Sequence, residues 1–262
     1  MTKTLKKSVG LYKRVLTKNE KILRLSMILA GEALSAFTVI YLISNQEYTH
    51  IKMAIGSFFI VLVPVAIEIV FRCRMRVIMF IAAELYSITP LLGECYKLYY
   101  ITDWWDKLLH IFGGIAFALF GVYLFRLMCK NEPRQIVVAV FALCFSLSIS
   151  VLWEFVEYGC DIVFNTDMQH ETIVEELRSY YLADAPGVAG SISAIDSVTV
   201  NGNELPIKGY LDIGLHDTMQ DMLVEAAGAI IAVIFILMNK EKTALFVPFP
   251  DENIGSGENR RE

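Results

Sequence analysis

Two stretches of the chain decide its fold: residues 111–125 read IFGGIAFALFGVYLF, and residues 135–153 read QIVVAVFALCFSLSISVLW. Neither stretch contains a charged residue. A helix of roughly 20 apolar residues crosses the hydrocarbon core of a bilayer, which is about 30 Å thick. Because six segments meet this requirement, the sequence predicts an all-α polytopic membrane helix bundle. The predicted spans are 24–44, 51–71, 76–96, 107–129, 135–158 and 217–239.

The composition agrees with an integral membrane protein and excludes several other classes. Of the 262 residues, 55% are hydrophobic and 19% are charged, and the mean hydropathy is +0.51. Soluble domains carry roughly 45–50% apolar and about 25% charged residues. The many apolar residues exclude a disordered chain, and five cysteines are too few for a disulfide scaffold. A net charge of −5 argues against a nucleic-acid binder.

The basic residues are distributed unevenly between the predicted spans. Of the 23 Lys and Arg residues, 18 fall in the N-terminal arm, after the second and fourth spans, and in the C-terminal tail. Because positively charged loops stay in the cytoplasm, we expect both termini to be cytoplasmic. Residues 1–23 would then form a basic cytoplasmic or interfacial arm, residues 24–239 the transmembrane domain, and residues 240–262 a tail with a disordered end.

The loop at 159–216 is the only sizeable segment predicted outside the membrane, and it would face outward. Apolar residues at helical spacing predict a short helix over 171–182. Further along, Asn201-Gly202 lies between alternating residues in SVTVNGNELPI, which favours a β-hairpin. We therefore expect a small cap, made of a short helix and a hairpin, that belongs to the transmembrane domain.

Three local features of the spans carry further expectations. In the third span Glu84 falls in the middle and Pro90 interrupts the last turns, and the sequence leaves open whether this span is kinked or partly re-entrant. At the end of the second span the i,i+4 spacing of Glu68 and Arg72 predicts an ion pair. Cys95 and Cys160 both fall on the outward side, and the sequence leaves open whether they form a disulfide.

Polar side chains gather at one end of the last three spans. The fourth span begins DWWDKLLH (103–110), the fifth ends WEFVEYGCD (153–161), and the sixth begins HDTMQD (216–221). Offsets of three and four residues place each polar set on one face of its helix. Since His110, Glu154 and Asp221 each lie about one turn inside a span, we expect them to meet at a common depth.

These residue types predict a metal site. Charged groups are costly inside a bilayer, so a convergent set of them indicates function. Carboxylates with one imidazole suit a divalent ion such as Mg²⁺, Mn²⁺, Zn²⁺ or Fe²⁺, which is the expected cofactor. Glu157 or Asp217 would act as general base in a metal-assisted hydrolase or transferase on a lipid or lipid-linked envelope substrate. The predicted metal ligands are His110, Glu154, Asp221 and Asp106.

The same residues leave other interpretations open. Acids in the first turn of a helix, such as Asp106 and Asp217, are stabilised by the helix dipole without any function. An ion-coupled transporter would use Glu32, Glu84 and Glu225 to continue the polar site inward. A non-catalytic membrane protein would instead bind a partner through the cap. The sequence contains no P-loop, GxSxG or HExxH pattern that would favour another enzyme class.

The three polar runs also carry a family resemblance. WWDKLLHIFGG (104–114), WEFVEY (153–158) and HDTMQDMLVEAAGA (216–229) resemble, in this order, runs of the YjdF-like family of multi-pass bacterial inner-membrane proteins. The resemblance covers roughly residues 75–240 and implies a location in the bacterial cell membrane. The family has no settled activity. A weaker similarity of the D-K-x-x-H run to VanZ-like proteins also implies an envelope role. The residues that match are Asp106, His110, Glu154, Glu157, Asp217 and Asp221, with Gln220 displaced by one position.

Overall fold

The computed structural model describes residues 15–102, 104–129, 133–238 and 249–250. Within them, six helical segments are long and apolar enough to cross a membrane, so the predicted polytopic helical bundle is confirmed. Each segment overlaps one of the predicted spans. The segments are Lys18–Ser44, Ile51–Val70, Val77–Cys95, Trp105–Met128, Gln135–Phe164 and Leu215–Met238.

The first helix, α2 (Lys18–Ser44), begins six residues before the predicted span. A capping box explains its start: the Thr17 hydroxyl accepts from the Glu20 backbone N–H, and the Glu20 carboxylate accepts from the Thr17 N–H. Part of the predicted basic arm is therefore helical. Residues 1–14 of that arm, and all of the predicted tail except 249–250, lie outside the described residues.

The second and third spans are each made of two helices. α3 (Ile51–Ile60) is followed by α4 (Val63–Val70), which has Pro64 in its first turn. α5 (Val77–Ser87) is followed by α6 (Thr89–Cys95), which has Pro90 in its first turn. Proline cannot donate a backbone hydrogen bond, so a helix breaks just before it. The break at Pro90 agrees with the kinked alternative for the third span, whereas the break at Pro64 was not predicted.

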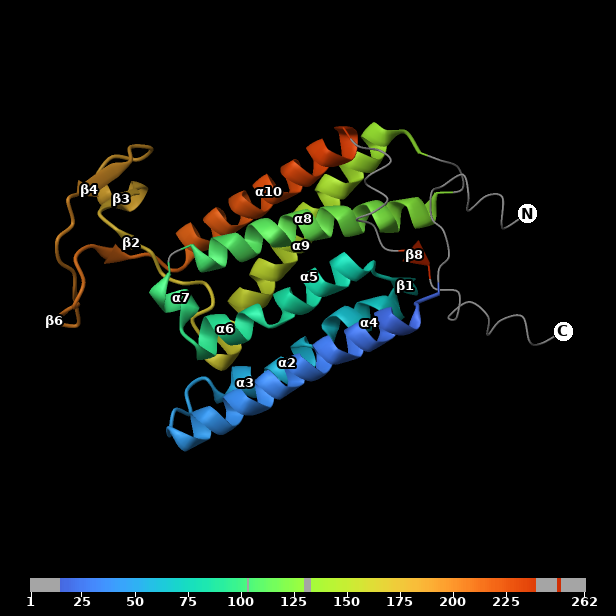
Figure 1. The fold of residues 1–262 in the computed structure, drawn as a ribbon. Helices are drawn as coiled ribbons and strands as arrows, with labels where there is room; N and C mark the ends of the chain where they lie inside the picture. The colour runs from blue at the N-terminus through green and yellow to red at the C-terminus, as the bar shows by residue number, and fades with distance from the viewer. Residues whose placement is uncertain (1–14, 103, 130–132, 239–248, 251–262) are drawn as a thin grey trace. The chain divides into compact units, whose positions relative to one another are not determined.

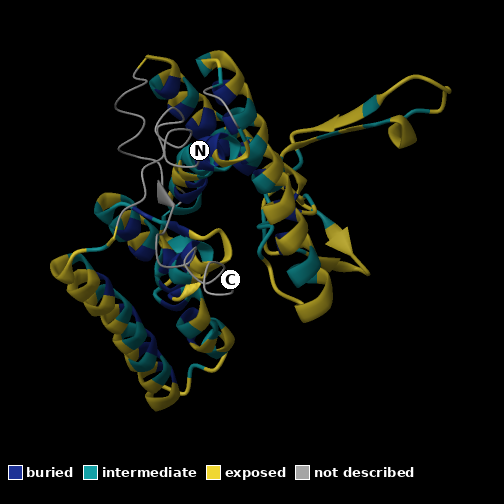
Figure 2. Ribbon diagram, turned by 90° about the vertical axis from the view of Figure 1, so that its right-hand side faces the viewer, coloured by how far each residue is buried: buried dark blue, intermediate teal, exposed yellow. Residues whose placement is uncertain are grey.

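The chain divides into two compact units, and the division cuts two helices, α9 (Gln135–Phe164) and α10 (Leu215–Met238). The first unit, Met1–Ser148 with Val224–Glu262, contains α2 to α6, the short helix α7 (Leu98–Ile101), and α8 (Trp105–Met128). Its helices bury small and branched side chains, including Val122, Ala142 and Ile236, against one another. Exposed residues, many of them large and apolar, lie on the outward helix faces (Figure 2). Such faces suit contact with lipid.

A buried ion-pair network joins three elements of the first unit and corrects one sequence expectation. Glu68 Oε1 lies 2.7 Å from Arg24 Nη1, and Glu68 Oε2 lies 2.8 Å from Arg74 Nη1. Arg24 also donates to the Met75 carbonyl. The predicted Glu68–Arg72 pair is wrong, because Arg72 has a positive φ and is exposed where the chain leaves the helix. Beside the network, strand β1 (Cys73–Arg74) pairs antiparallel with β8 (Phe249–Pro250).

The second unit, Ile149–Leu223, holds the end of α9, the start of α10 and the loop between them. β2 (Ile173–Val174) pairs with β7 (Tyr210–Leu211), and β3 (Glu176–Ser179) pairs with β4 (Gly190–Ser193). The helix predicted over 171–182 is therefore wrong except for the one-turn 3₁₀ helix η1 (Tyr180–Leu182).

The predicted hairpin at Asn201-Gly202 is confirmed. β5 (Thr199–Val200) pairs with β6 (Asn203–Glu204), and both turn residues have positive φ, at 51° and 82°. A two-residue turn with positive φ at both positions matches the right-handed twist of the strands, which explains the Asn-Gly pair. The loop of the second unit is therefore a series of short antiparallel strand pairs.

The carboxylate of Asp212 joins two segments of the loop of the second unit, just before α10 begins. Asp212 accepts from the backbone N–H groups of Thr172, Gly214 and His216 at 2.8 to 3.2 Å. Burial alone would raise the pKa of Asp212, but these three donors, together with His216, outweigh it and leave the pKa below its ordinary value. At the end of α9, Asp161 accepts similarly from the backbone of the residues that follow it.

The cysteine question left open by the sequence is answered for both residues. Cys95 and Cys160 are free thiols. The buried Cys95 lies with its sulfur 3.6 Å from the carbonyl oxygen of His50, to which it donates. Beside it, His50 Nδ1 lies 2.8 Å from Glu94 Oε1.

Candidate functional site

His110 is the imidazole around which the candidate site is built. It lies in the second turn of α8 and is 7% exposed. Its Nε2 atom is 3.8 Å from Asp106 Oδ1, one turn earlier on the same helix, and its Nδ1 atom is 3.5 Å from Glu225 Oε2 of α10. Each ring nitrogen therefore faces a different carboxylate.

Close packing of α8 against α10 brings Glu225 to His110, and two glycines permit it. A Cβ added at Gly114 would lie 2.1 Å from the carbonyl oxygen of Glu225. A Cβ added at Gly228 would lie 2.2 Å from the carbonyl oxygen of Ile111. Only glycine allows backbones to approach so closely, as in the small-residue interfaces of membrane helices. The two helices consequently run side by side (Figure 1).

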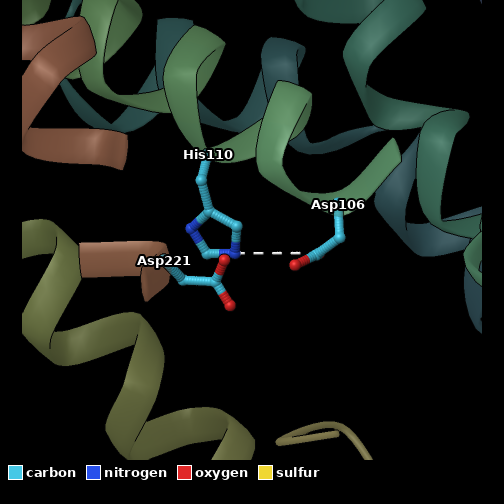
Figure 3. Close-up of side chains that lie close together, drawn as sticks. All are labelled: Asp106, His110 and Asp221. Atoms are coloured by element: carbon cyan, nitrogen blue, oxygen red, sulfur yellow. Dashed lines mark ion pairs between the residues drawn. The ribbon is translucent and has the colours of Figure 1, made fainter. Parts of the chain in front are cut away.

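Asp221 completes a group of three potential metal ligands. It is 1% exposed and lies one turn before Glu225 in the uninterrupted helix α10. One ligand atom each from Asp106, His110 and Asp221 lies within 4.8 Å of the others. Figure 3 shows both carboxylates on the side of the imidazole that carries Nε2. Of the four ligands predicted from the sequence, these three are brought together.

The remaining predicted residues are placed on α9 and α10 but do not join this group among the described residues. Glu154 and Glu157 are both buried on α9, at 4% and 7% exposure. Glu157 Oε1 accepts a 2.7 Å hydrogen bond from the indole Nε1 of Trp153. Asp217 lies in the first turn of α10 and is half-buried, where the helix dipole favours its negative charge.

The chemistry of the three-residue group suits a divalent cation. Two carboxylates and one imidazole are hard and borderline ligands of the kind that bind Mn²⁺, Fe²⁺, Zn²⁺ or Mg²⁺. The half-buried carboxylate of Asp106 and the buried carboxylate of Asp221 repel each other when both are charged, and a bound cation would relieve that repulsion. Three protein ligands would leave coordination positions free for water and substrate, as in catalytic rather than structural metal sites.

Sequence reasoning overlooked the contact between Glu225 and His110. It grouped Glu225 with Glu32 and Glu84 as an inward path, because all three are acids within spans. The spacing of four residues between Asp221 and Glu225 does put both on one face of α10. Which α8 residue this face meets depends on the close contact of α8 and α10 at Gly114 and Gly228, which joins residues far apart in the sequence.

Comparison with protein families gives a match that covers most of the chain. Residues 26–242 match the family described as "Predicted membrane protein (DUF2238)". The matched range includes every span except the first residues of α2, and it includes Asp106, His110 and Asp221. Searches of curated proteins and of solved structures found no match.

Proposed function

We propose that this chain, which belongs to the DUF2238 family of predicted membrane proteins, holds a divalent metal ion between Asp106, His110 and Asp221. The single observation that carries the proposal is the convergence of these three ligand atoms within 4.8 Å. Burial adds to it, because His110 and Asp221 are almost fully enclosed and lie within helices that cross the membrane. Ionisable residues inside membrane spans mark functional sites.

The proposed activity is metal-assisted hydrolysis or group transfer on a lipid or a lipid-linked envelope substrate. A bound divalent ion lowers the pKa of a coordinated water and polarises a phosphoryl or carbonyl oxygen. The general base would be either Asp217, which lies one turn before Asp221 on α10, or the buried Glu157 of α9. Glu154 would add a carboxylate to the ligands. Asp106, His110 and Asp221 lie within the first two turns of their helices. A site at this depth would meet the headgroups of lipids rather than their acyl chains.

The orientation of the site follows from the distribution of charge. With 18 of 23 basic residues on the side of the termini, the positive-inside rule places the start of α8 and α10 at the outer surface. We assign the protein on this basis to the bacterial inner membrane with both termini in the cytoplasm. The resemblance to YjdF-like proteins supports the same location.

Metal content tests the proposal directly. Detergent-purified protein would be incubated with Mn²⁺ or Zn²⁺, desalted and subjected to elemental analysis. We expect about one bound ion per chain, and loss of that ion in His110→Ala and Asp221→Asn. Glu32→Gln, which removes a half-buried carboxylate from α2, serves as control and should keep the ion. A folded wild-type protein without metal, or a His110→Ala variant that keeps it, contradicts the proposal.

The activity needs a separate assay. Metal-loaded protein would be mixed with vesicles of phosphatidylglycerol and phosphatidylethanolamine, and released headgroups and phosphate would be measured. Release that depends on metal and falls at least tenfold in Asp217→Asn or Glu157→Gln supports hydrolysis with that residue as base. If metal binds but no bond in either lipid is cleaved, hydrolysis of these glycerophospholipids is refuted while the metal site stands.

A second candidate function, ion-coupled transport, has one observation in its favour. Glu84 of α5 is 4% exposed, and its Oε1 atom has no hydrogen-bond partner among the described residues. Its carboxyl group interacts electrostatically with the charged side chains of Arg24, Glu68 and Glu32. A buried carboxylate of this kind is a typical proton site in carriers. Proton uptake by vesicles containing the protein, abolished in Glu84→Gln but unchanged in His110→Ala, would favour transport.

A further inference from the structure

Glu225 has a position that the proposed metal ligands alone do not explain. It is 3% exposed, and its Oε2 atom is 3.5 Å from Nδ1 of His110. Its other oxygen, Oε1, is buried and has no hydrogen-bond partner among the described residues. A carboxylate enclosed among transmembrane helices is costly unless a partner compensates it. The His110 imidazole is the partner that the structure provides.

Gly113 of α8 lies beside the Glu225 carboxyl group, at a distance where an added Cβ would make only ordinary van der Waals contact. A Cβ added at Gly113 would lie 4.0 Å from the Glu225 carboxyl carbon and 3.4 Å from the hydroxyl oxygen of Tyr86. Tyr86 belongs to α5, and its hydroxyl donates to the carbonyl oxygen of Leu109, the residue before His110. The Glu225 carboxyl group and the Tyr86 hydroxyl therefore both lie near Gly113 of α8, and Glu225 faces the ring nitrogen of His110 other than the one that faces Asp106.

If the imidazole of His110 binds a metal, its two nitrogen atoms must differ in protonation. One nitrogen must present its lone pair to the ion, so the other must carry the proton. Histidines that bind metals usually donate that proton to a carboxylate or carbonyl, which fixes the tautomer and the orientation of the ring. At His110, Nε2 faces Asp106, and Nδ1 faces Glu225.

We propose that Glu225 is the positioning residue of the site: it accepts the Nδ1 proton of His110 and thereby directs Nε2 toward the divalent ion. This inference rests on the proposed metal site and assigns Glu225 a role outside the inward path considered from the sequence. It also makes the close approach of α8 and α10 a functional requirement, because Glu225 reaches His110 only across the Gly114 contact.

Cobalt binding tests this inference. Detergent-purified protein would be titrated with Co²⁺, and both the dissociation constant and the visible absorption bands would be recorded, since these bands report the ligand geometry. We expect Glu225→Ala to weaken Co²⁺ binding by about 10- to 100-fold and to shift the bands. Glu225→Gln offers an amide oxygen at the same place and should recover a substantial part of the affinity. Glu32→Gln is the matched control and should bind as the wild type does.

The outcomes separate this inference from the metal site itself. If the wild type binds no Co²⁺, the proposed function and the inference both fail. If the wild type binds Co²⁺ and Glu225→Ala binds it with the same affinity and the same bands, only the role of Glu225 is refuted. Thermal unfolding of each variant shows whether it is folded. If Glu225→Ala does not fold, Glu225→Leu, which fills similar space but has no oxygen to accept the Nδ1 proton, replaces it and should show the same loss of affinity; wild-type affinity in a folded Glu225→Leu variant would refute the role of Glu225.

Discussion

The packing of α8 against α10 makes a strong prediction for Gly114→Ala. The new Cβ would lie 2.1 Å from the Glu225 carbonyl oxygen and 2.9 Å from the Ala229 nitrogen, whereas ordinary contact begins at 3.4 Å. All these atoms belong to helix backbones, so no side chain can rotate away. The two helices must separate by about 1 Å, and overpacking of this kind costs about 1–3 kcal/mol.

The effect of Gly114→Ala on stability is measured by thermal unfolding of detergent-purified protein. For a chain of this size, we expect the Tm to fall by about 2–12 °C. The metal affinity should fall as well, because a displacement of about 1 Å is enough to loosen a binding site. Gly228→Ala should behave in the same way, since its Cβ would lie 2.2 Å from the Ile111 carbonyl oxygen.

Two other glycines in helices provide matched controls. Gly56 in α3 and Gly159 in α9 have nothing within 4 Å of an added Cβ. Alanine favours a helix over glycine by up to about 1 kcal/mol, so both substitutions should leave the Tm unchanged or raise it. A Gly114→Ala variant as stable as Gly56→Ala, with wild-type metal affinity, would refute the close helix contact and the route by which Glu225 reaches His110.

Two further predictions concern parts of the chain away from the metal site. Glu68→Gln removes the carboxylate charge that pairs with the buried Arg24 and the half-buried Arg74, so the free energy of unfolding should fall by about 3–5 kcal/mol; Arg72→Gln is the exposed control, and an equal effect of both would contradict the network. Asp212 has a lowered pKa, so its contribution to the stability of the loop is present above its ordinary pKa of 3.8 and is lost as the pH falls through the lowered value. At neutral pH, Asp212→Asn should therefore speed hydrogen exchange at the three amides that bond this carboxylate, and unchanged exchange would contradict the assignment.

The transmembrane fold could be predicted because it depends on local composition. Each span is a run of apolar residues long enough to cross a bilayer, and Pro90 marked the place in the third span where the break between α5 and α6 lies. The break before Pro64 depends on the same physics and was available from the sequence. The apolar spacing over 171–182 was misleading, because Glu176–Ser179 pairs with Gly190–Ser193, and pairing partners in a sheet override local periodicity.

The polar contacts were harder to predict, because they depend on which helices are neighbours. Glu68 pairs with Arg24, which is 44 residues away, and not with the residue one turn further on. Depth along the spans placed His110, Glu154 and Asp221 at one level, and His110 and Asp221 do offer ligand atoms close together, but the third member of the group is Asp106 and not Glu154. Depth could not give the rotation of α10 about its own axis, which turns Glu225 toward His110.

A divalent ion bound by Asp106, His110 and Asp221 would be visible in a crystal structure by its anomalous scattering. Crystals of the detergent-purified protein grown with Mn²⁺ or Zn²⁺ would be measured at the absorption edge of the metal to locate anomalous scattering. The account predicts one peak within coordination distance of all three side chains, and no peak there in His110→Ala. A well-ordered wild-type structure without a peak at these residues, or with its only peak elsewhere, would contradict it.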